Sequence, residues 1–153
     1  MRHWISPEGE IDLAALPLDS VFRQALAGGE GARAAISFLG VIHRHGRPEA
    51  GVFLLGLLAS AGEDWHLREE LVRALDGFHT PGCVQFLCEE LRHRKANNAN
   101  RRYLNAILKV LEGMPAELVE ERLTALVEDP ALSRRMRQKV DQVLWRVLLR
   151  KNH

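Results

Sequence analysis

The fold is decided by the stretch from residue 64 to residue 95, which reads DWHLREELVRALDGFHTPGCVQFLCEELRHRK. Asp64 and Thr80 are residue types that cap helix starts, and Pro81 is favoured in the first turn of a helix. The residues from Gly77 to Pro81 interrupt the helical pattern. The stretch therefore predicts a helical hairpin, with helices over residues 64–77 and 81–95.

This hairpin recurs along the chain. Pro48, Pro81 and Pro115 each begin a second helix after a short turn, and they are spaced 33 and 34 residues apart. Shifts of 33, 33 and then 36 residues superpose the apolar positions of successive units: Phe38, Leu71, Leu104 and Val140, and Ile42, Leu75, Leu108 and Leu144. Because each helix pair cannot bury its apolar face alone, we expect neighbouring pairs to stack.

The repeated pattern resembles the HEAT-like and armadillo-like α-solenoids over about residues 31–150. The resemblance rests on the proline-opened second helices and on arginines near the start of the first helices: Arg68, Arg101, Arg102, Arg134 and Arg135. It implies an all-α, right-handed α-solenoid of about three helical hairpins, with an N-terminal cap helix and an unpaired C-terminal helix. The chain departs from the family in its short length and in the run 97–100, where a single turn aspartate is usual. Tetratricopeptide repeats share the 34-residue period, but their pattern of small and aromatic residues is missing here.

Length and composition fit one soluble domain. The 153 residues are 46% hydrophobic and 27% charged, which is typical of a globular chain. We expect a single domain over residues 1–153, with a cap segment over residues 1–30 and repeats over residues 31–150. Eight helices are predicted, near residues 18–27, 31–45, 48–61, 64–77, 81–95, 99–113, 115–128 and 133–150.

Several protein classes are excluded. Two cysteines are too few for a disulfide-stapled secreted fold, and a net charge of +1 argues against a nucleic-acid footprint over the whole chain. Met1–Glu8 contains no apolar run of the kind that a signal peptide needs. The uncharged stretch Ala50–Ala61 is too short to span a bilayer. We therefore expect a cytoplasmic protein with no membrane partner and with reduced cysteines in its core.

The helix predicted over residues 48–61 is apolar nearly all round. A helix that is hydrophobic on every side is expected to be covered on every side. The N-terminal segment contains its own apolar residues: Ile11, Leu13, Leu16, Leu18, Val21, Phe22 and Leu26. We expect this segment to fold over the helix as a cap.

An arginine-rich edge is the first candidate binding feature. Stacked repeats place equivalent positions side by side, so we expect one stripe of anion-binding residues: Arg101, Arg102, Arg134, Arg135 and Arg137. Such a stripe suits an acidic protein surface or a nucleic-acid backbone. The alternative is a solvated edge whose arginines pair with nearby carboxylates: Glu63, Asp64, Glu69, Glu70 and Asp129. Only Tyr103 interleaves the stripe, which weakens an interpretation as a site for single strands.

Two further surfaces are candidates for protein binding. The polar outer faces of the helices over 81–95 and 115–128 are predicted to form a groove with six contact residues: Gln85, Phe86, Glu89, Arg92, Glu117 and Glu121. In the last helix, Trp145 and Leu149 lie off the main apolar stripe. They indicate a protein contact or a homodimer seam, unless a broad helix packs both of its faces against the previous repeat.

We find no pattern that indicates catalysis, a metal or a cofactor. The seven histidines form no HExxH motif, the cysteines form no CxxC motif, and the segment 28–31 lacks the lysine of a phosphate loop. The glutamates on the outer faces are those of ordinary solubilising surfaces: Glu89, Glu90, Glu117, Glu120 and Glu121. We therefore expect a protein that is not an enzyme and that binds neither a metal nor a cofactor.

The predicted function is a non-catalytic protein-binding module, adaptor or scaffold that uses the repeat surface and whose partner protein the sequence does not identify. One alternative is a nucleic-acid-binding HEAT-like protein that uses the arginine-rich edge. Another is a bacterial immunity protein or a chaperone-like protein. Arginine far outnumbers lysine, which is associated with GC-rich bacterial genomes.

Overall fold

The computed structural model describes residues 7–152, and over this range the chain is all-helical. The single domain predicted over residues 1–153 therefore extends beyond the described residues at both ends. The segment Met1–Glu8, in which no signal peptide is expected, lies mostly outside the described residues. The helices are α1 (Asp19–Ala27), α2 (Glu30–Ile42), α3 (Pro48–Ala59), α4 (Trp65–Ala74), α5 (Pro81–His93), α6 (Arg101–Glu112), α7 (Ala116–Val127) and α8 (Arg134–Lys151). The eight predicted helices are confirmed.

Local capping explains where several helices begin. The side chain of Asp64 accepts a hydrogen bond from the backbone N–H of Leu67 at 3.1 Å, and Thr80 accepts one from Cys83 at 3.2 Å. Ser133 caps α8 in the same way, through the N–H of Met136 at 3.1 Å. Asp64 and Thr80 are the caps predicted above from the hairpin sequence, and each of the three side chains accepts from an N–H that has no partner within its own helix.

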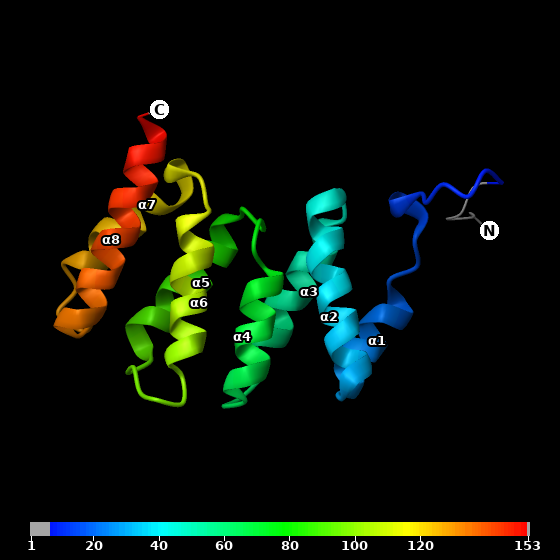
Figure 1. Ribbon diagram of the computed structural model, residues 1–153, viewed down its shortest axis with the longest axis horizontal. Helices are drawn as coiled ribbons and strands as arrows, with labels where there is room; N and C mark the ends of the chain where they lie inside the picture. The colour runs from blue at the N-terminus through cyan, green and yellow to red at the C-terminus, as the bar shows by residue number, and fades with distance from the viewer. Residues whose placement is uncertain (1–6, 153) are drawn as a thin grey trace.

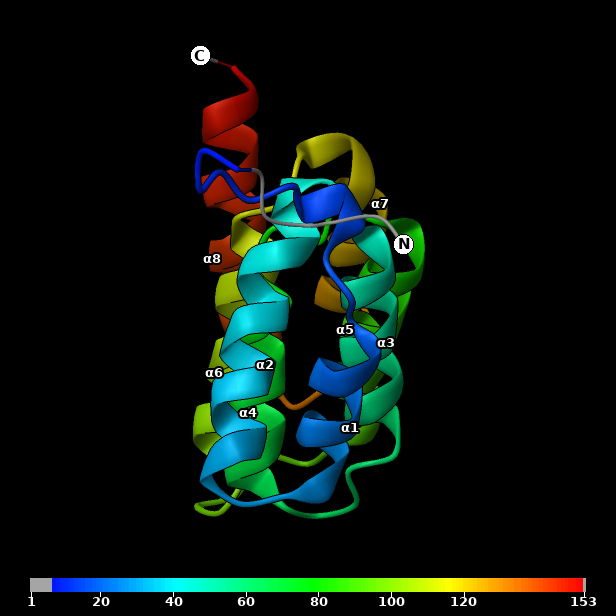
Figure 2. The same cartoon turned by 90° about the vertical axis from the view of Figure 1, so that its right-hand side faces the viewer.

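The helices alternate between two layers along the chain. Figure 1 shows them following one another along the long axis of the molecule, from α1 near one end to α8 at the other. Figure 2 shows α2, α4, α6 and α8 in one layer and α1, α3, α5 and α7 in the other. Successive members of the first layer pack directly on each other, and α1 with α2, α3 with α4 and α7 with α8 pack between the layers.

Most of the apolar positions that the repeat superposes form the core between these layers, but Phe38 is 41% exposed and Leu144 is only partly buried. Leu71, Leu87 and Leu104 are among its fully buried side chains. The helix α6 is the most deeply embedded, with seven of its twelve residues buried. Its place between α4, α5 and α8 explains this, since each neighbour covers a different part of its surface.

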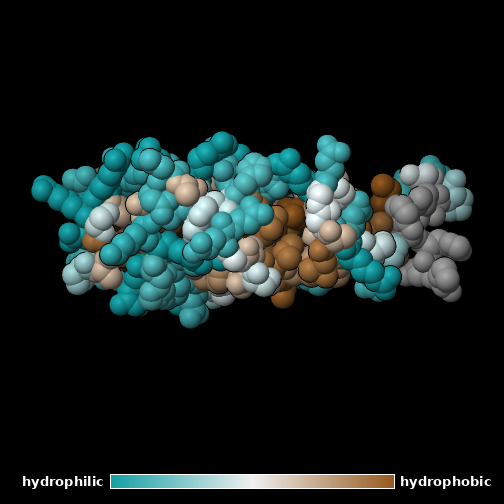
Figure 3. All heavy atoms as spheres, turned by 90° about the horizontal axis from the view of Figure 1, so that it is seen from below, coloured by the Kyte–Doolittle hydropathy of each residue, from teal (hydrophilic) through white to brown (hydrophobic). Residues whose placement is uncertain are grey.

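The expectation that α3 is covered on every side is wrong. The N-terminal segment does reach α3, because the Phe22 and Phe53 rings stack with centroids 4.2 Å apart and Leu16 and Leu18 are buried. However, α1 packs mainly along α2, and Val52 on the outer face of α3 stays 64% exposed. Figure 3 shows hydrophobic side chains gathered over the part of the molecule that contains α3.

Candidate functional site

The strongest surface feature is the positive charge of the layer formed by α2, α4, α6 and α8. It is concentrated towards the C-terminal end, where α6 contains three Lys or Arg and α8 contains seven, against one acidic residue in each helix. The other layer differs, because α7 contains three glutamates and one arginine. The net charge of +1 therefore hides two layers of different charge.

Part of this positive charge is neutralised by ion pairs that join one helix to the next. Arg33 of α2 pairs with Glu70 of α4, with the Nε atom 2.8 Å from Oε1. Arg102 of α6 pairs with Glu69 of α4 at 3.2 Å, and Arg146 of α8 pairs with Glu112 of α6 at 3.4 Å. The predicted alternative of arginines paired with nearby carboxylates therefore holds for Arg102, and also for Arg92, which binds Asp129 at 2.8 Å.

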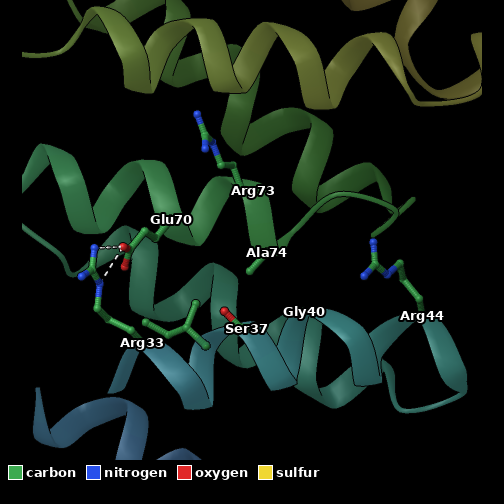
Figure 4. A pocket seen from close by; sticks show the side chains of 8 residues that line it. Arg33, Ser37, Gly40, Arg44, Glu70, Arg73 and Ala74 are labelled. Atoms are coloured by element: carbon green, nitrogen blue, oxygen red, sulfur yellow. Dashed lines mark hydrogen bonds and ion pairs between the residues drawn. The ribbon is translucent and has the colours of Figure 1, made fainter. Parts of the chain in front are cut away.

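Two pockets lie in succession on this layer. The first, of about 310 Å³, lies between α2 and α4, with Arg33, Arg44 and Arg73 around it (Figure 4). Gly40 and Ala74 let the two helices approach closely there, because a Cβ atom at Gly40 would lie 3.1 Å from the Cα of Ala74.

The second pocket, of about 840 Å³, extends over α4, α6 and α8. Arg73 lines both pockets, so the two are neighbours on this layer. We call the two together the basic groove; its charged lining residues are Arg33, Arg44, Glu70, Arg73, Asp76, Arg102, Lys109, Glu112 and Arg150. Within the described chain, the amine of Lys109 has no hydrogen bond or ion pair, so it is available to a ligand.

The predicted anion-binding residues are divided among three places. Arg102 lines the basic groove. Arg101 and Arg135 come together in a separate pocket, while Arg134 and Arg137 line a third one with Asp141. The expected single stripe does not form, because the side chains of adjacent residues on a helix point about 100° apart and so face different neighbours.

The predicted protein-binding residues form two separate surfaces. Helices α5 and α7 pack side by side and together carry six of them: Gln85, Phe86, Glu89, Arg92, Glu117 and Glu121. Phe86 is half-buried against the core, and Glu89 pairs with His93 at 2.7 Å. Trp145 and Leu149 lie on α8, in the other layer, and are 62% and 52% exposed.

An interior polar network is a feature that sequence reasoning missed, and it shows that the prediction of Glu90 on an outer solubilising face is wrong, since that side chain is only 12% exposed. Arg68 is only 3% exposed and donates to a carboxylate oxygen of Glu90 at 3.1 Å and to the carbonyl of Leu58 at 3.2 Å. The Tyr103 hydroxyl donates to the same oxygen of Glu90. Burial, and then the hydrogen bond to Glu90, raise the pKa of Tyr103 far above its usual value. The position of Tyr103 beside Leu104 and Ile107 on the apolar face of its helix is the clue that could have placed it inside.

This network is a structural element and offers no reactive centre. Its groups come from α4, α5 and α6 and satisfy one another inside the fold. The cysteine thiols are equally inert, since burial raises the pKa of Cys83 to about 12 and that of Cys88 to about 11. Between residues 7 and 152 there is no group of three or more metal-ligating side chains. Over the same range no helix is long and apolar enough to cross a bilayer.

Comparisons of the chain with protein-family models, with curated proteins and with solved structures found no match. The resemblance to HEAT-like and armadillo-like repeats therefore stays a prediction.

Proposed function

We propose that this chain is a non-catalytic protein-binding module that holds an acidic segment of a partner protein in the basic groove. The observation that carries the proposal is the second part of the groove, a pocket of about 840 Å³ that extends over three successive helices of one layer. Four cations line it, Arg73, Arg102, Lys109 and Arg150, against three carboxylates: those of Asp76 and Glu112 in the lining, and that of Glu69, which pairs with both Arg73 and Arg102. An extended segment rich in Asp and Glu complements such a lining in shape and in charge.

The lining favours a polypeptide over a single-stranded nucleic acid. Ala106, Val110 and Gly113 offer apolar and backbone surface between the cations. Bound single strands usually stack their bases on aromatic side chains, and no aromatic residue lines this groove among the described residues. Arginine forks bind carboxylates with paired hydrogen bonds, which suits Asp and Glu side chains.

The proposed architecture is an α-solenoid of three hairpins, α2 with α3, α4 with α5 and α6 with α7, flanked by α1 and α8. The alternation of the helices between two layers supports it. So do the ion pairs between α2 and α4, α4 and α6, and α6 and α8, which join residues 37, 33 and 34 positions apart. These separations are close to the repeat of 33 to 36 residues predicted from the sequence, and the first is about one helical turn longer than its predicted shift of 33.

Nucleic-acid binding is the second candidate. The excess of Lys and Arg in α6 and α8 favours it, since phosphate contacts need cations and no particular base-reading geometry. It predicts binding that weakens steeply with salt and does not depend on sequence.

A fluorescence anisotropy titration separates the two candidates. A labelled peptide rich in Asp and Glu is compared with single- and double-stranded DNA of equal charge, each at several salt concentrations. We expect saturable binding of the peptide that Lys109→Glu weakens at least tenfold. The matched control is Arg122→Glu, an exposed residue of α7 on the opposite layer, which should leave the affinity unchanged.

Two results would overturn the proposal: no saturable peptide binding at low salt, or an equal loss in the control variant. Tighter binding of DNA, lost in the Lys109 variant, would establish the second candidate instead.

Affinity capture from the source cell then compares three variants with the wild type. A partner that is lost with Lys109→Glu but kept with Glu117→Lys and Trp145→Ala binds the basic groove and not the surfaces predicted from the sequence.

A further inference from the structure

A small pocket lies outside the basic groove, at the edge of the molecule where α6 and α8 begin. It has a volume of about 210 Å³ and is lined by the loop before α6 and by the first turns of α8. Its lining residues are Ala96, Asn97, Arg101, Ser133, Arg135, Met136 and Lys139. Sites for whole organic ligands have volumes of about 300–1,000 Å³, so this pocket is sized for a single head group.

The pocket differs from the others in its charge. Three cations face it, Arg101, Arg135 and Lys139, and no described carboxylate lines it. Each of the other four pockets described contains at least one carboxylate: Glu70, Asp76 with Glu112, Glu117 and Asp141. The positive charge is thus uncompensated at this one edge.

The three cations keep hydrogen-bond donors for a ligand. Arg101 donates to the side-chain oxygen of Asn98 at 3.0 Å, and Lys139 donates to that of Asn105 at 3.1 Å. Both acceptors are neutral amides. Arg135 makes no hydrogen bond or ion pair with any described residue. Burial, followed by the charges of Arg135 and Arg101, lowers the pKa of Lys139, as mutual repulsion among unpaired cations requires.

The loop that forms one wall is held by asparagines. Asn100 is 2% exposed, and its side chain donates to the carbonyl of Lys95 at 2.9 Å and accepts from the N–H of Asn97 at 2.8 Å. The Asn97 side-chain oxygen accepts from the N–H groups of Ala99 and Asn100, at 2.8 and 2.9 Å. Aspartate could make several of these bonds, but it would add a negative charge beside the pocket. Asparagine holds the loop through its hydrogen bonds and adds no negative charge to the pocket.

We propose that the pocket formed by Arg101, Arg135 and Lys139 is a binding site for a phosphoryl group. A phosphoryl dianion has the charge to offset these cations and has oxygens that accept from two guanidinium groups and an amine at once. The site is separate from the basic groove, because none of its three cations lines that groove. The shared chemistry is the phosphoryl group, whose source is either a free phosphate compound or a phosphorylated side chain of a protein.

The test is a calorimetric titration of the whole chain at constant ionic strength. Inorganic phosphate and a phosphoserine peptide are the two probes, with the unphosphorylated peptide and chloride as references. We expect saturable binding of at least one phosphorylated probe and none of the references. The tighter of the two probes identifies the source. Arg135→Gln and Lys139→Gln should each weaken this binding at least tenfold.

Arg134→Gln is the matched control, because Arg134 is the exposed neighbour of Arg135 on the same helix and lines a different pocket. It should leave the affinity within about twofold. Circular dichroism and the unfolding midpoint establish that each variant is folded. The proposal is overturned if neither phosphorylated probe binds saturably, or if the Arg134 variant loses as much affinity as the Arg135 variant.

Discussion

The side chain of Arg68 shows how this fold accommodates a charge in its interior. Besides Glu90 and the Leu58 carbonyl, it donates to the carbonyl of Gly62 at 2.5 Å, and its guanidinium lies 5.5 Å from the centre of the Tyr103 ring. A buried charge is tolerated only when it is paired and its donors are used. The network ties α4 to α5 and α6, so these contacts hold successive helices in register.

Replacing Arg68 with methionine should destabilise the fold by about 3 kcal/mol, because Glu90 would lose its buried cation and keep only Arg94 and Tyr103, while the carbonyls of Leu58 and Gly62 would lose a donor. The matched control is Arg73→Met in the same helix, whose side chain is 63% exposed and pairs with Glu69 across one turn. That change should cost less than about 1 kcal/mol. Urea unfolding of both variants measures the difference, and equal losses would mean that the network contributes nothing.

His43 should make stability depend on pH. The residue is 7% exposed, its Nε2 donates to the Ala74 carbonyl at 2.8 Å, and its Nδ1 is buried without a partner among the described residues. Burial lowers the pKa of His43, so the unfolded chain takes up a proton more readily than the folded chain. We expect constant stability above about pH 7, and a loss of up to about 1.4 kcal/mol per pH unit as the pH falls below about 6.5.

Urea unfolding at pH 7.5, 6.5 and 5.5 measures this dependence. His43→Gln keeps a donor for the Ala74 carbonyl and removes the titrating group, so its stability should change less with pH. His45→Gln is the control, because His45 is exposed and should keep the behaviour of the wild type. If the wild type and the His43 variant lose stability in parallel, His43 is not the titrating group.

At the scale of the element, α3 shows how one helix has two different sides. Its inner side meets the core so closely that a Cβ atom added at Gly51 would overlap the Phe78 ring. Its outer side carries Gly56, around which an added Cβ would meet nothing within 4 Å. The sequence pattern is apolar on both sides and does not distinguish them, because hydropathy does not tell which side a neighbour covers.

The two glycines therefore predict opposite effects of the same substitution. Gly51→Ala should destabilise the fold by about 1–3 kcal/mol, since the Phe78 ring would have to move within a packed core. Gly56→Ala should stabilise it by about 0.5–1 kcal/mol, because alanine favours a helix interior over glycine. Unfolding midpoints of the two variants test the prediction, and a loss of stability in both would contradict it.

At the scale of the whole molecule, burial is uneven from one end to the other. Only Ala25 is buried among the nine residues of α1, whereas α6 buries seven of twelve. Exposed large hydrophobic side chains are also distributed unevenly along the described part of the chain. Ile11, Leu26, Phe38, Val41 and Val52 lie before residue 60, and only Trp145 and Leu149 lie after it.

This gradient predicts the order of local opening. Amides of α1 should exchange with solvent at least about 100-fold faster than those of α6, because an element with few buried apolar contacts opens at low free energy. Hydrogen exchange of the native chain, followed by mass spectrometry of peptides from each helix, measures the two rates. Equal protection of α1 and α6 would show instead that the molecule opens only as a single unit.

The sequence by itself determined the eight helices, the caps at Asp64, Thr80 and Ser133 and the buried stripes. These features depend on residues within about one turn of each other, and the helical period and the capping preferences therefore describe them. The stacking of neighbouring helix pairs follows only from the repeat.

Only the tertiary structure decided what the individual charged residues do. Arg68 and Arg101 occupy corresponding positions 33 residues apart, yet Arg68 is buried with Glu90, whereas Arg101 is exposed and donates to Asn98. The tertiary structure likewise places Arg101 and Arg102 in different pockets and brings Arg101 into one pocket with Arg135 and Lys139. It also leaves one side of α3 uncovered. The physical reason is that the pairing and exposure of a side chain depend on which atoms of other helices come within a few ångströms, and no pattern along a single helix contains that information.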